Sequence, residues 1–129
     1  MDTKQIGDIA EAHVIVRLTE LGYTILEPRG DNARYDLVIE TPEGFKKGQI
    51  KNGRLQGQTI SFNTCSIHGR KRKRRSYEGH IDVFWVYCKG TGKVYEVPIS
   101  KAPKTEMLLR LGKTRNGQTV RHQAQSFEL

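Results

Sequence analysis

A carboxylate, an amide and an ammonium group fall close together in the segment from residue 35 to residue 52. This segment is typical of two strands joined by a tight turn, with Asp36 opening the first strand. Gln49 and Lys51 stand two residues apart near the end of the second strand, so their side chains share one face of the sheet. Such a patch offers oxygen ligands to a hard cation, with a positive charge beside them.

The turn between the two strands decides whether Asp36 joins this patch. A two-residue loop at Glu43–Gly44 or a four-residue loop over residues 42–45 predicts Asp36 directly opposite Lys51, with Cβ atoms about 5 Å apart. An odd-numbered loop without a bulge would place the two side chains on opposite faces. Taken alone, the hairpin favours a surface ion pair, which contributes little to stability, over a catalytic site.

A second carboxylate comes from residues 3–21, where the apolar spacing predicts an amphipathic helix. Asp2 or Thr3 caps the start of this helix, and Gly22 ends it. Glu11 lies off the apolar stripe and, on its own, is typical of a solvated helix carboxylate. The helix therefore adds an acidic side chain whose role depends on what lies next to it.

These side chains together change the interpretation of the hairpin. The two carboxylates and one amide of Glu11, Asp36 and Gln49 are oxygen ligands of the kind that Mg²⁺ prefers. A lysine beside them, Lys51, can activate water or stabilise charge that develops on a phosphorus centre. The combination indicates metal-assisted hydrolysis of a phosphodiester bond.

Six consecutive cationic residues carry most of the positive charge of the chain. The net charge is +8, and it falls to +2 when this run is left out. Such a run cannot pack in a core, so residues 66–80 are expected to form an extended basic loop that contacts a polyanion, most commonly nucleic acid. A nuclear localisation signal and a plain solvated turn are the alternatives. The expected DNA-contacting residues are Arg70, Lys71, Arg72, Lys73, Arg74, Arg75 and, in the loop before Asp36, Arg34.

The remaining pattern predicts the scaffold. Strands are expected at residues 22–28, 54–64, 81–88 and 93–98, and a second helix at residues 103–111. The third of these strands is the most apolar run, which indicates a central buried strand. This order predicts a single α+β (mixed α/β) domain over residues 1–129, in which helices flank a central mixed or antiparallel sheet of four to five strands.

Composition narrows the class of protein. Hydrophobic residues make up 36% and charged residues 28% of the chain, and no apolar run approaches the ~20 residues of a membrane span. The first residues lack the apolar stretch of a signal peptide. We therefore expect an intracellular, cytoplasmic protein without membrane contact, in which Cys65 and Cys88 are reduced. His68 and His80 near Cys65 lack the spacing of a zinc site.

Five short motifs occur in order along most of the chain. They are Gly7-Asp-Ile-Ala-Glu11, Gly30-Asp-Asn-Ala-Arg-Tyr-Asp36, Gln49-Ile-Lys51, Ile81-Asp-Val-Phe84 and Val94-Tyr-Glu-Val-Pro98. This set resembles the PD-(D/E)xK nuclease superfamily and, more narrowly, the small branch associated with group I intron homing endonucleases. Tyr35 stands where the superfamily has proline, and Gln49 stands where it has a second acidic residue. The homing branch is itself marked by Gln-x-Lys.

The resemblance implies a restriction-endonuclease-like core and site-specific, Mg²⁺-dependent cleavage of double-stranded DNA, with Mn²⁺ as a substitute. Asp36, Glu11 and the backbone carbonyl of Ile50 would bind the metal. Lys51 would orient or activate the attacking water, and Gln49 would position water or act as a neutral ligand. The products would carry 5′-phosphate and 3′-hydroxyl ends.

Partners and alternatives follow from the same residues. One chain holds one such set and a duplex has two strands, so we expect a homodimer or a homotetramer. A Holliday junction resolvase-like nuclease is one alternative, although that class normally carries an acid at the position of Gln49. A non-catalytic DNA-binding protein on a nuclease scaffold is the other. The C-terminal segment adds three weaker candidates for DNA contact, Arg115, Arg121 and His122.

Overall fold

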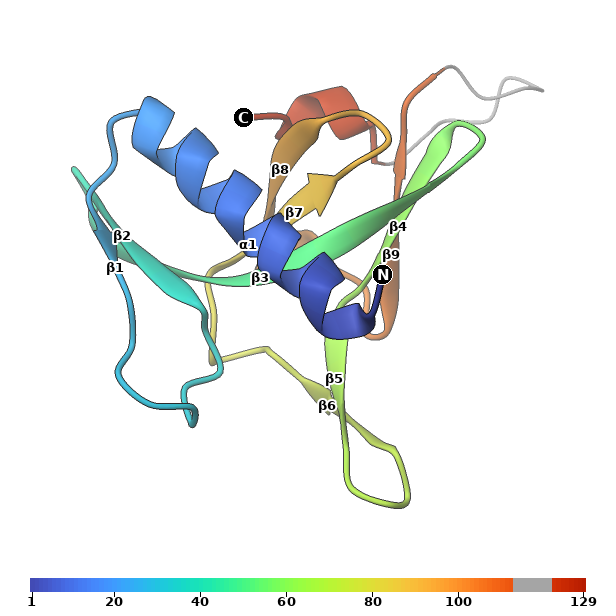
Figure 1. The fold of residues 1–129 in the computed structure, drawn as a ribbon, viewed down its shortest axis with the longest axis horizontal. Coiled ribbons are helices and arrows are strands. Elements are labelled where there is room, and N and C mark those ends of the chain that lie inside the picture. The colour runs from blue at the N-terminus through green and yellow to red at the C-terminus, as the bar shows by residue number, and fades with distance from the viewer. Residues whose placement is uncertain (113–121) are drawn as a thin grey trace.

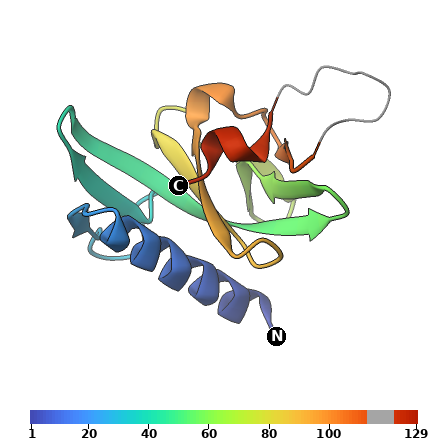
Figure 2. The same cartoon turned by 90° about the horizontal axis from the view of Figure 1, so that it is seen from above.

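The computed structural model describes residues 1–112 and 122–129. One long helix lies across one face of a twisted sheet, and a short helical segment close to the C-terminus packs on the other face (Figures 1 and 2). A separate two-stranded ribbon projects from the body. The α+β class and the mixed sheet are confirmed. No helix in the described part of the chain is long and apolar enough to cross a membrane.

The helix α1 (Thr3–Glu20) agrees with the expected range. The carboxylate of Asp2 accepts the backbone N–H of Gln5 at 2.8 Å, and the Gln5 side chain accepts the Asp2 N–H at 3.1 Å. These two bonds form the predicted capping box, which satisfies donors that have no partner within the helix. The buried side of the helix is formed by Ala10, Val14 and Leu18.

In the described part of the chain, the main sheet contains seven strands, more than the four to five expected. Its members are β1 (Ile25–Leu26), β2 (Leu37–Thr41), β3 (Gly44–Gln56), β4 (Thr59–Asn63), β7 (Val83–Cys88), β8 (Lys93–Pro98) and β9 (Glu106–Arg110). The 13-residue β3 organises the sheet. Its first part pairs antiparallel with β2, its middle pairs parallel with β7, and its end pairs antiparallel with β4.

The strand β7 lies between two cores, as its apolar sequence predicted. All six of its residues are buried. Alternate side chains therefore serve different layers. Val83, Trp85 and Tyr87 pack in the core that α1 covers, whereas Phe84, Val86 and Cys88 pack in the core that η3 (Ala124–Phe127) covers. Cys88 and Cys65 are buried and unpaired, in agreement with the expected reduced state.

Two expected elements are wrong. Residues 103–111 do not form a helix, because the strand β9 occupies residues 106–110 and pairs with β4. Met107 and Leu109 are fully buried while Leu108 between them is 53% exposed, an alternation that belongs to a strand. The strand expected at residues 54–64 is the end of β3, a turn at Gly57 with φ of +60°, and β4.

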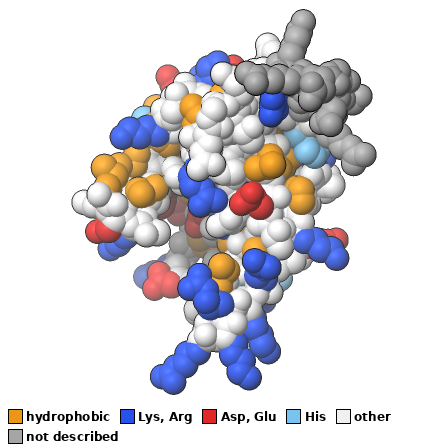
Figure 3. Space-filling view, turned by 90° about the vertical axis from the view of Figure 1, so that its right-hand side faces the viewer, with side chains coloured by type: hydrophobic (Ala, Val, Ile, Leu, Met, Phe, Trp, Pro, Cys, Tyr) orange, Lys and Arg blue, Asp and Glu red, His pale blue; other side chains and the backbone are white. Residues whose placement is uncertain are grey.

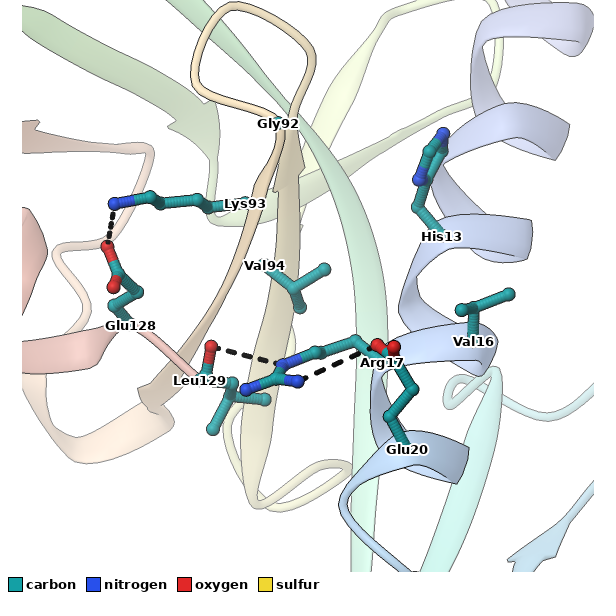
Figure 4. A pocket seen from close by; sticks show the side chains of 9 residues that line it. All are labelled: His13, Val16, Arg17, Glu20, Gly92, Lys93, Val94, Glu128 and Leu129. Carbon is teal, nitrogen blue, oxygen red and sulfur yellow. Dashed lines mark hydrogen bonds and ion pairs between the residues drawn. The ribbon is translucent and has the colours of Figure 1, made fainter.

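The last residues are attached to the helix and to β8. Glu128 forms a 2.8 Å ion pair with Lys93, and the Arg17 Nε donates to the carbonyl of Leu129 at 3.2 Å. The Leu129 N–H donates to the Val94 carbonyl at 2.9 Å. Figure 4 shows the Lys93–Glu128 and Arg17–Leu129 contacts around a hollow between α1 and β8. Through Arg17, these contacts attach α1 to the C-terminus and so to β8.

Candidate active site

Asp36 lies one residue before β2, beside the middle of β3. Its backbone N–H donates to the Gly48 carbonyl at 2.8 Å, and its carboxylate accepts the Ile50 N–H at 2.7 Å. The side chain is half-buried. Burial raises the pKa of the Asp36 carboxyl, while the Ile50 N–H and the nearby Lys51 charge lower it and only partly offset the effect. The Ile50 N–H therefore fixes the orientation of the Asp36 carboxylate, and together with Lys51 it only partly offsets the cost of burying that charge.

The register of the β2–β3 hairpin differs from the prediction by two residues. The observed ladder pairs Leu37 with Gly48, whereas the expected register would have paired it with Ile50. The turn consists of residues 42–43, because Thr41 pairs with Gly44. A shift of two preserves side-chain faces, since strand side chains alternate with a period of two. The prediction of Asp36 directly opposite Lys51 is wrong, but the two still interact electrostatically.

Glu11 reaches Asp36 from α1. Burial raises the pKa of the Glu11 carboxyl, and the negative charges of Asp36, Glu27 and Asp8 raise it further. Glu11 and Asp36 line the same open hollow of about 350 Å³. The fold therefore brings the helix carboxylate and the strand carboxylate to one hollow.

The same hollow contains two carboxylates that sequence reasoning missed. Glu27 and Asp31 line it together with Glu11 and Asp36. Both belong to the segment that leads from β1 to Asp36, and both are exposed. Their position four residues apart in a polar loop just before Asp36 was the available signal. The hollow is acidic because α1 contributes the carboxylate of Glu11 and this loop contributes those of Glu27 and Asp31.

Lys51 lies in β3 and its ammonium group contacts Tyr77. The Lys51 Nζ donates to the Tyr77 hydroxyl at 3.2 Å. Tyr77 follows the strand β6 (Lys73–Ser76) and is 5% exposed. Sequence reasoning did not single out this tyrosine, although it is the one aromatic residue of the basic segment 66–80. Gln49, two residues before Lys51, is half-buried in the same strand.

The donors in this hollow fit a divalent cation. Among residues 1–112 and 122–129, no three or more His, Cys, Asp or Glu side chains lie close enough together to hold a metal on their own. A set of two carboxylates, Glu11 and Asp36, completed by neutral oxygens is the remaining arrangement, and such oxygens suit Mg²⁺. Burial raises the pKa of both carboxyls, and for Glu11 the negative charges of Asp36, Glu27 and Asp8 raise it further. A cation between them would remove that repulsion.

The basic segment forms a β-hairpin in place of the extended loop that was expected. The strands β5 (Cys65–His68) and β6 pair antiparallel and form a sheet of their own. All six cationic residues from Arg70 to Arg75 are exposed. Figure 3 shows lysine and arginine side chains gathered at the end of the molecule where this ribbon projects. We call β5, β6 and the turn between them the basic hairpin.

Arg34 holds the base of the basic hairpin. Its guanidinium donates to the carbonyl of Ser76, to the hydroxyl of Ser66 at 2.6 Å and to the carbonyl of Arg75 at 3.4 Å. It also lies over the ring of Tyr77, 4.2 Å from the centre. Arg34 was expected to bind DNA, but these contacts occupy its guanidinium group. In the structure, Arg34 fixes the basic hairpin to the rest of the fold.

The C-terminal segment holds the three weaker candidates for DNA contact. Arg115 and Arg121 lie outside the described residues. His122 packs against Phe127 with ring centres 6.3 Å apart. His13 on α1 is exposed and stacks on Tyr87, with ring centres 4.0 Å apart. The candidate site therefore comprises Glu11, Asp36, Gln49 and Lys51, with Glu27, Asp31 and Tyr77 around them.

Comparison with known proteins agrees with this geometry. The sequence profile of the PD-(D/E)XK endonucleases matches residues 1–129. Among solved structures, the chain is similar to the bacterial homing endonuclease I-Ssp6803I, with 26% sequence identity, a TM-score of 0.75, and coverage of 99% of this chain and 89% of that one. No curated protein sequence matches the chain. By its match over the whole length, the chain belongs to the PD-(D/E)XK endonuclease family and is a DNA endonuclease.

Proposed function

We propose that this endonuclease cuts both strands of duplex DNA at specific sites, with Mg²⁺ as its cofactor and Mn²⁺ as a substitute. The observation that carries the proposal is the position of Glu11 and Asp36 in one hollow, with Lys51 close enough to act on Asp36. The similarity to a protein described as a homing endonuclease supports site-specific cleavage.

Each residue has a defined task in this proposal. Glu11 and Asp36 hold the metal together with the backbone carbonyl of Ile50, whose N–H already fixes Asp36. When bound, the metal supplies positive charge to the phosphate under attack. Lys51 orients the attacking water and stabilises charge on the phosphate. Gln49 offers a neutral amide to water or metal, so the site carries one negative charge less than a site with an acid there.

The basic hairpin supplies affinity for the DNA backbone. A two-stranded ribbon has the dimensions to enter the major groove, and its cationic tip can neutralise phosphates on either side. Its base is attached, through Arg34, two residues before Asp36. DNA held by the hairpin is thereby delivered next to the carboxylates. We further propose a homodimer or homotetramer, because each chain offers one such site to a two-stranded substrate.

Cleavage of long duplex DNA in Mg²⁺ tests the proposal, with Lys51→Ala as the variant. We expect discrete fragments from the unmodified chain and a rate at least ~100-fold lower from the variant, because stabilisation of the reacting phosphate is lost. DNA affinity should change by less than about threefold. Lys104→Ala is the matched control, since Lys104 is exposed and lies outside the site.

The outcomes separate the alternatives. Retained cleavage by Lys51→Ala contradicts the proposed mechanism. Cleavage of four-way junctions alone, with linear duplex left intact, identifies a resolvase-like nuclease. Fragments with random ends contradict site specificity.

A further inference from the structure

Tyr77 is the side chain that fixes the ammonium group of Lys51. The Lys51 Nζ lies 3.2 Å from the Tyr77 hydroxyl and 4.8 Å from the ring centre, so the hydroxyl is the nearer group. The ammonium donates and the hydroxyl oxygen accepts. A lysine side chain has four rotatable carbons and three donors, so one fixed acceptor strongly restricts where its charge lies.

The ring of Tyr77 is itself held on several sides. It is 5% exposed and meets Phe84 edge-on, with ring centres 5.6 Å apart. The Tyr77 carbonyl accepts the His80 N–H at 2.9 Å, which fixes the backbone behind the ring. The Arg34 guanidinium lies 4.2 Å from the ring centre. The acceptor offered to Lys51 is therefore a rigid one.

Tyr77 also joins the basic hairpin to the active site. It is the first residue after β6, and the arginine that packs on its ring bonds to Ser66 and to the Ser76 carbonyl in that hairpin. A displacement of the hairpin base thus moves the ring that holds Lys51. The DNA-contacting element and the reactive lysine share one aromatic side chain.

We propose that Tyr77 positions the Lys51 ammonium for cleavage and so couples the basic hairpin to the active site. The inference rests on the proposed role of Lys51 in cleavage. Tyr77 acts through Lys51 and is a positioning residue. This role adds a residue to the candidate set of Glu11, Asp36, Gln49 and Lys51, because none of the five sequence motifs contains Tyr77.

Tyr77→Phe tests the role, because it keeps the ring and removes the acceptor. We expect the single-turnover cleavage rate with saturating DNA to fall about tenfold, equal to about 1.4 kcal/mol in the barrier. The dissociation constant for DNA should stay within about twofold. Tyr95→Phe is the matched control, since this tyrosine is also buried and its hydroxyl bonds to Thr91 at 3.0 Å, away from the site. We expect no change in the control.

A second measurement is independent of cleavage. In NMR spectra of the free protein, the side-chain order parameter of Lys51 should fall in Tyr77→Phe and stay unchanged in Tyr95→Phe. Thermal melting checks that both variants are folded.

The results separate this inference from the proposed function. A Tyr77→Phe variant that cleaves at the unmodified rate overturns the positioning role, and so does a slow variant in which Lys51 is as ordered as before. If Lys51→Ala is inactive while Tyr77→Phe is normal, the inference alone fails. If Lys51→Ala still cleaves, the proposed function has failed at the lysine itself.

Discussion

At the residue scale, the candidate site is marked by two carboxyls whose pKa is raised, first of all by burial. Two carboxylates from α1 and from the start of β2 line one hollow, and each has a raised pKa. The Ile50 N–H and Lys51 offset this effect only in part for Asp36. Buried carboxylates of this kind are typical of a site whose ligand stabilises their ionised form, and a divalent cation is a ligand with matching charge.

The burial of Asp36 makes the stability of the fold depend on pH. Because burial raises the pKa of Asp36 in the folded state, the unfolded chain releases this proton at a lower pH than the folded chain does. The ionised carboxylate therefore destabilises the fold. The penalty is absent below the unfolded pKa, about 4, and grows as the pH rises through the raised folded value.

Asp36→Asn removes this penalty. In metal-free protein at pH 7, we expect the melting temperature to rise by a few degrees, corresponding to about 1 kcal/mol after allowance for solvent around the half-buried group. The gain should vanish near pH 3. Added Mg²⁺ should stabilise the unmodified protein more than the variant, because a ligand stabilises only the state that binds it. Equal gains at pH 3 and pH 7 contradict the charge argument.

At the element scale, β3 carries the site and its packing is tight. A Cβ atom built at Gly48 would meet the Trp85 ring at 2.3 Å, whereas one built at Gly7 in α1 would meet no atom within 4 Å. Glycine at position 48 lets the large indole lie against the strand one residue before Gln49. The packing of Trp85 from β7 therefore requires that residue 48 of β3 has no side chain.

Gly48→Ala should destabilise the fold by about 3 kcal/mol, or roughly 10 °C in melting temperature, because neither the ring nor the strand can move freely. Gly7→Ala is the matched control. It should raise the melting temperature by roughly 2–4 °C, since glycine in a helix costs about 0.5–1 kcal/mol relative to alanine. Thermal unfolding at one pH measures both. A Gly48→Ala variant as stable as the unmodified chain would show that Trp85 repacks without strain.

The two faces of the basic hairpin make a second prediction at this scale. The ladder pairs Ser66 with Arg75 and Ile67 with Arg74, so the neighbouring arginines point to opposite faces. Arg34 bonds to the Ser66 hydroxyl, which turns the Ser66 and Arg75 face towards the segment that carries Asp36.

Arg75→Ala should therefore weaken DNA binding and lower the slope of log Kd against log salt by about 0.9, the value for one phosphate contact. Arg74→Ala removes a charge from the opposite face of the same strand and should lower the slope by less. Binding is measured from 50 to 200 mM salt in the absence of Mg²⁺. An equal effect of both substitutions contradicts the assignment of faces.

Local signals in the sequence predicted the elements that they determine directly. The capping box and apolar spacing predicted α1, and the run of apolar residues predicted β7. The order of the sequence motifs predicted that Glu11, Asp36 and Lys51 lie close to one another. The register of the hairpin was wrong by two because Pro42 and Glu43 form the turn, and two even-numbered alternatives differ little in local sequence.

Long-range contacts determined what the sequence did not show. Residues 106–110 form a strand because they pair with β4, which lies more than forty residues earlier. The basic run has no apolar pattern, yet it pairs as a ribbon whose base is fixed by Arg34. Tyr77 joins the site only through the fold, since no spacing in the sequence relates it to Lys51.

At the scale of the whole molecule, one chain presents one set of reactive residues to two strands of DNA. If the chain acts as a dimer, subunits mixed with an equal amount of Lys51→Ala should form hybrids that cut one strand. On a circular DNA that the unmodified enzyme linearises, these hybrids should accumulate nicked circles. Sedimentation of the free protein gives the subunit number. A monomer that linearises circles without a nicked intermediate contradicts the paired arrangement.

The packing of Trp85 also has a consequence for observation. It is the only tryptophan in the chain, it is fully buried, and its indole N–H donates to the Glu96 carboxylate at 2.8 Å. Lys46 holds the other oxygen of that carboxylate at 3.2 Å. Emission excited at 295 nm thus comes from a single fluorophore, pressed against Gly48 and separated from Lys51 by a short length of β3. The fluorescence of Trp85 therefore reports on changes in the surroundings of β3, the strand that holds Gln49 and Lys51.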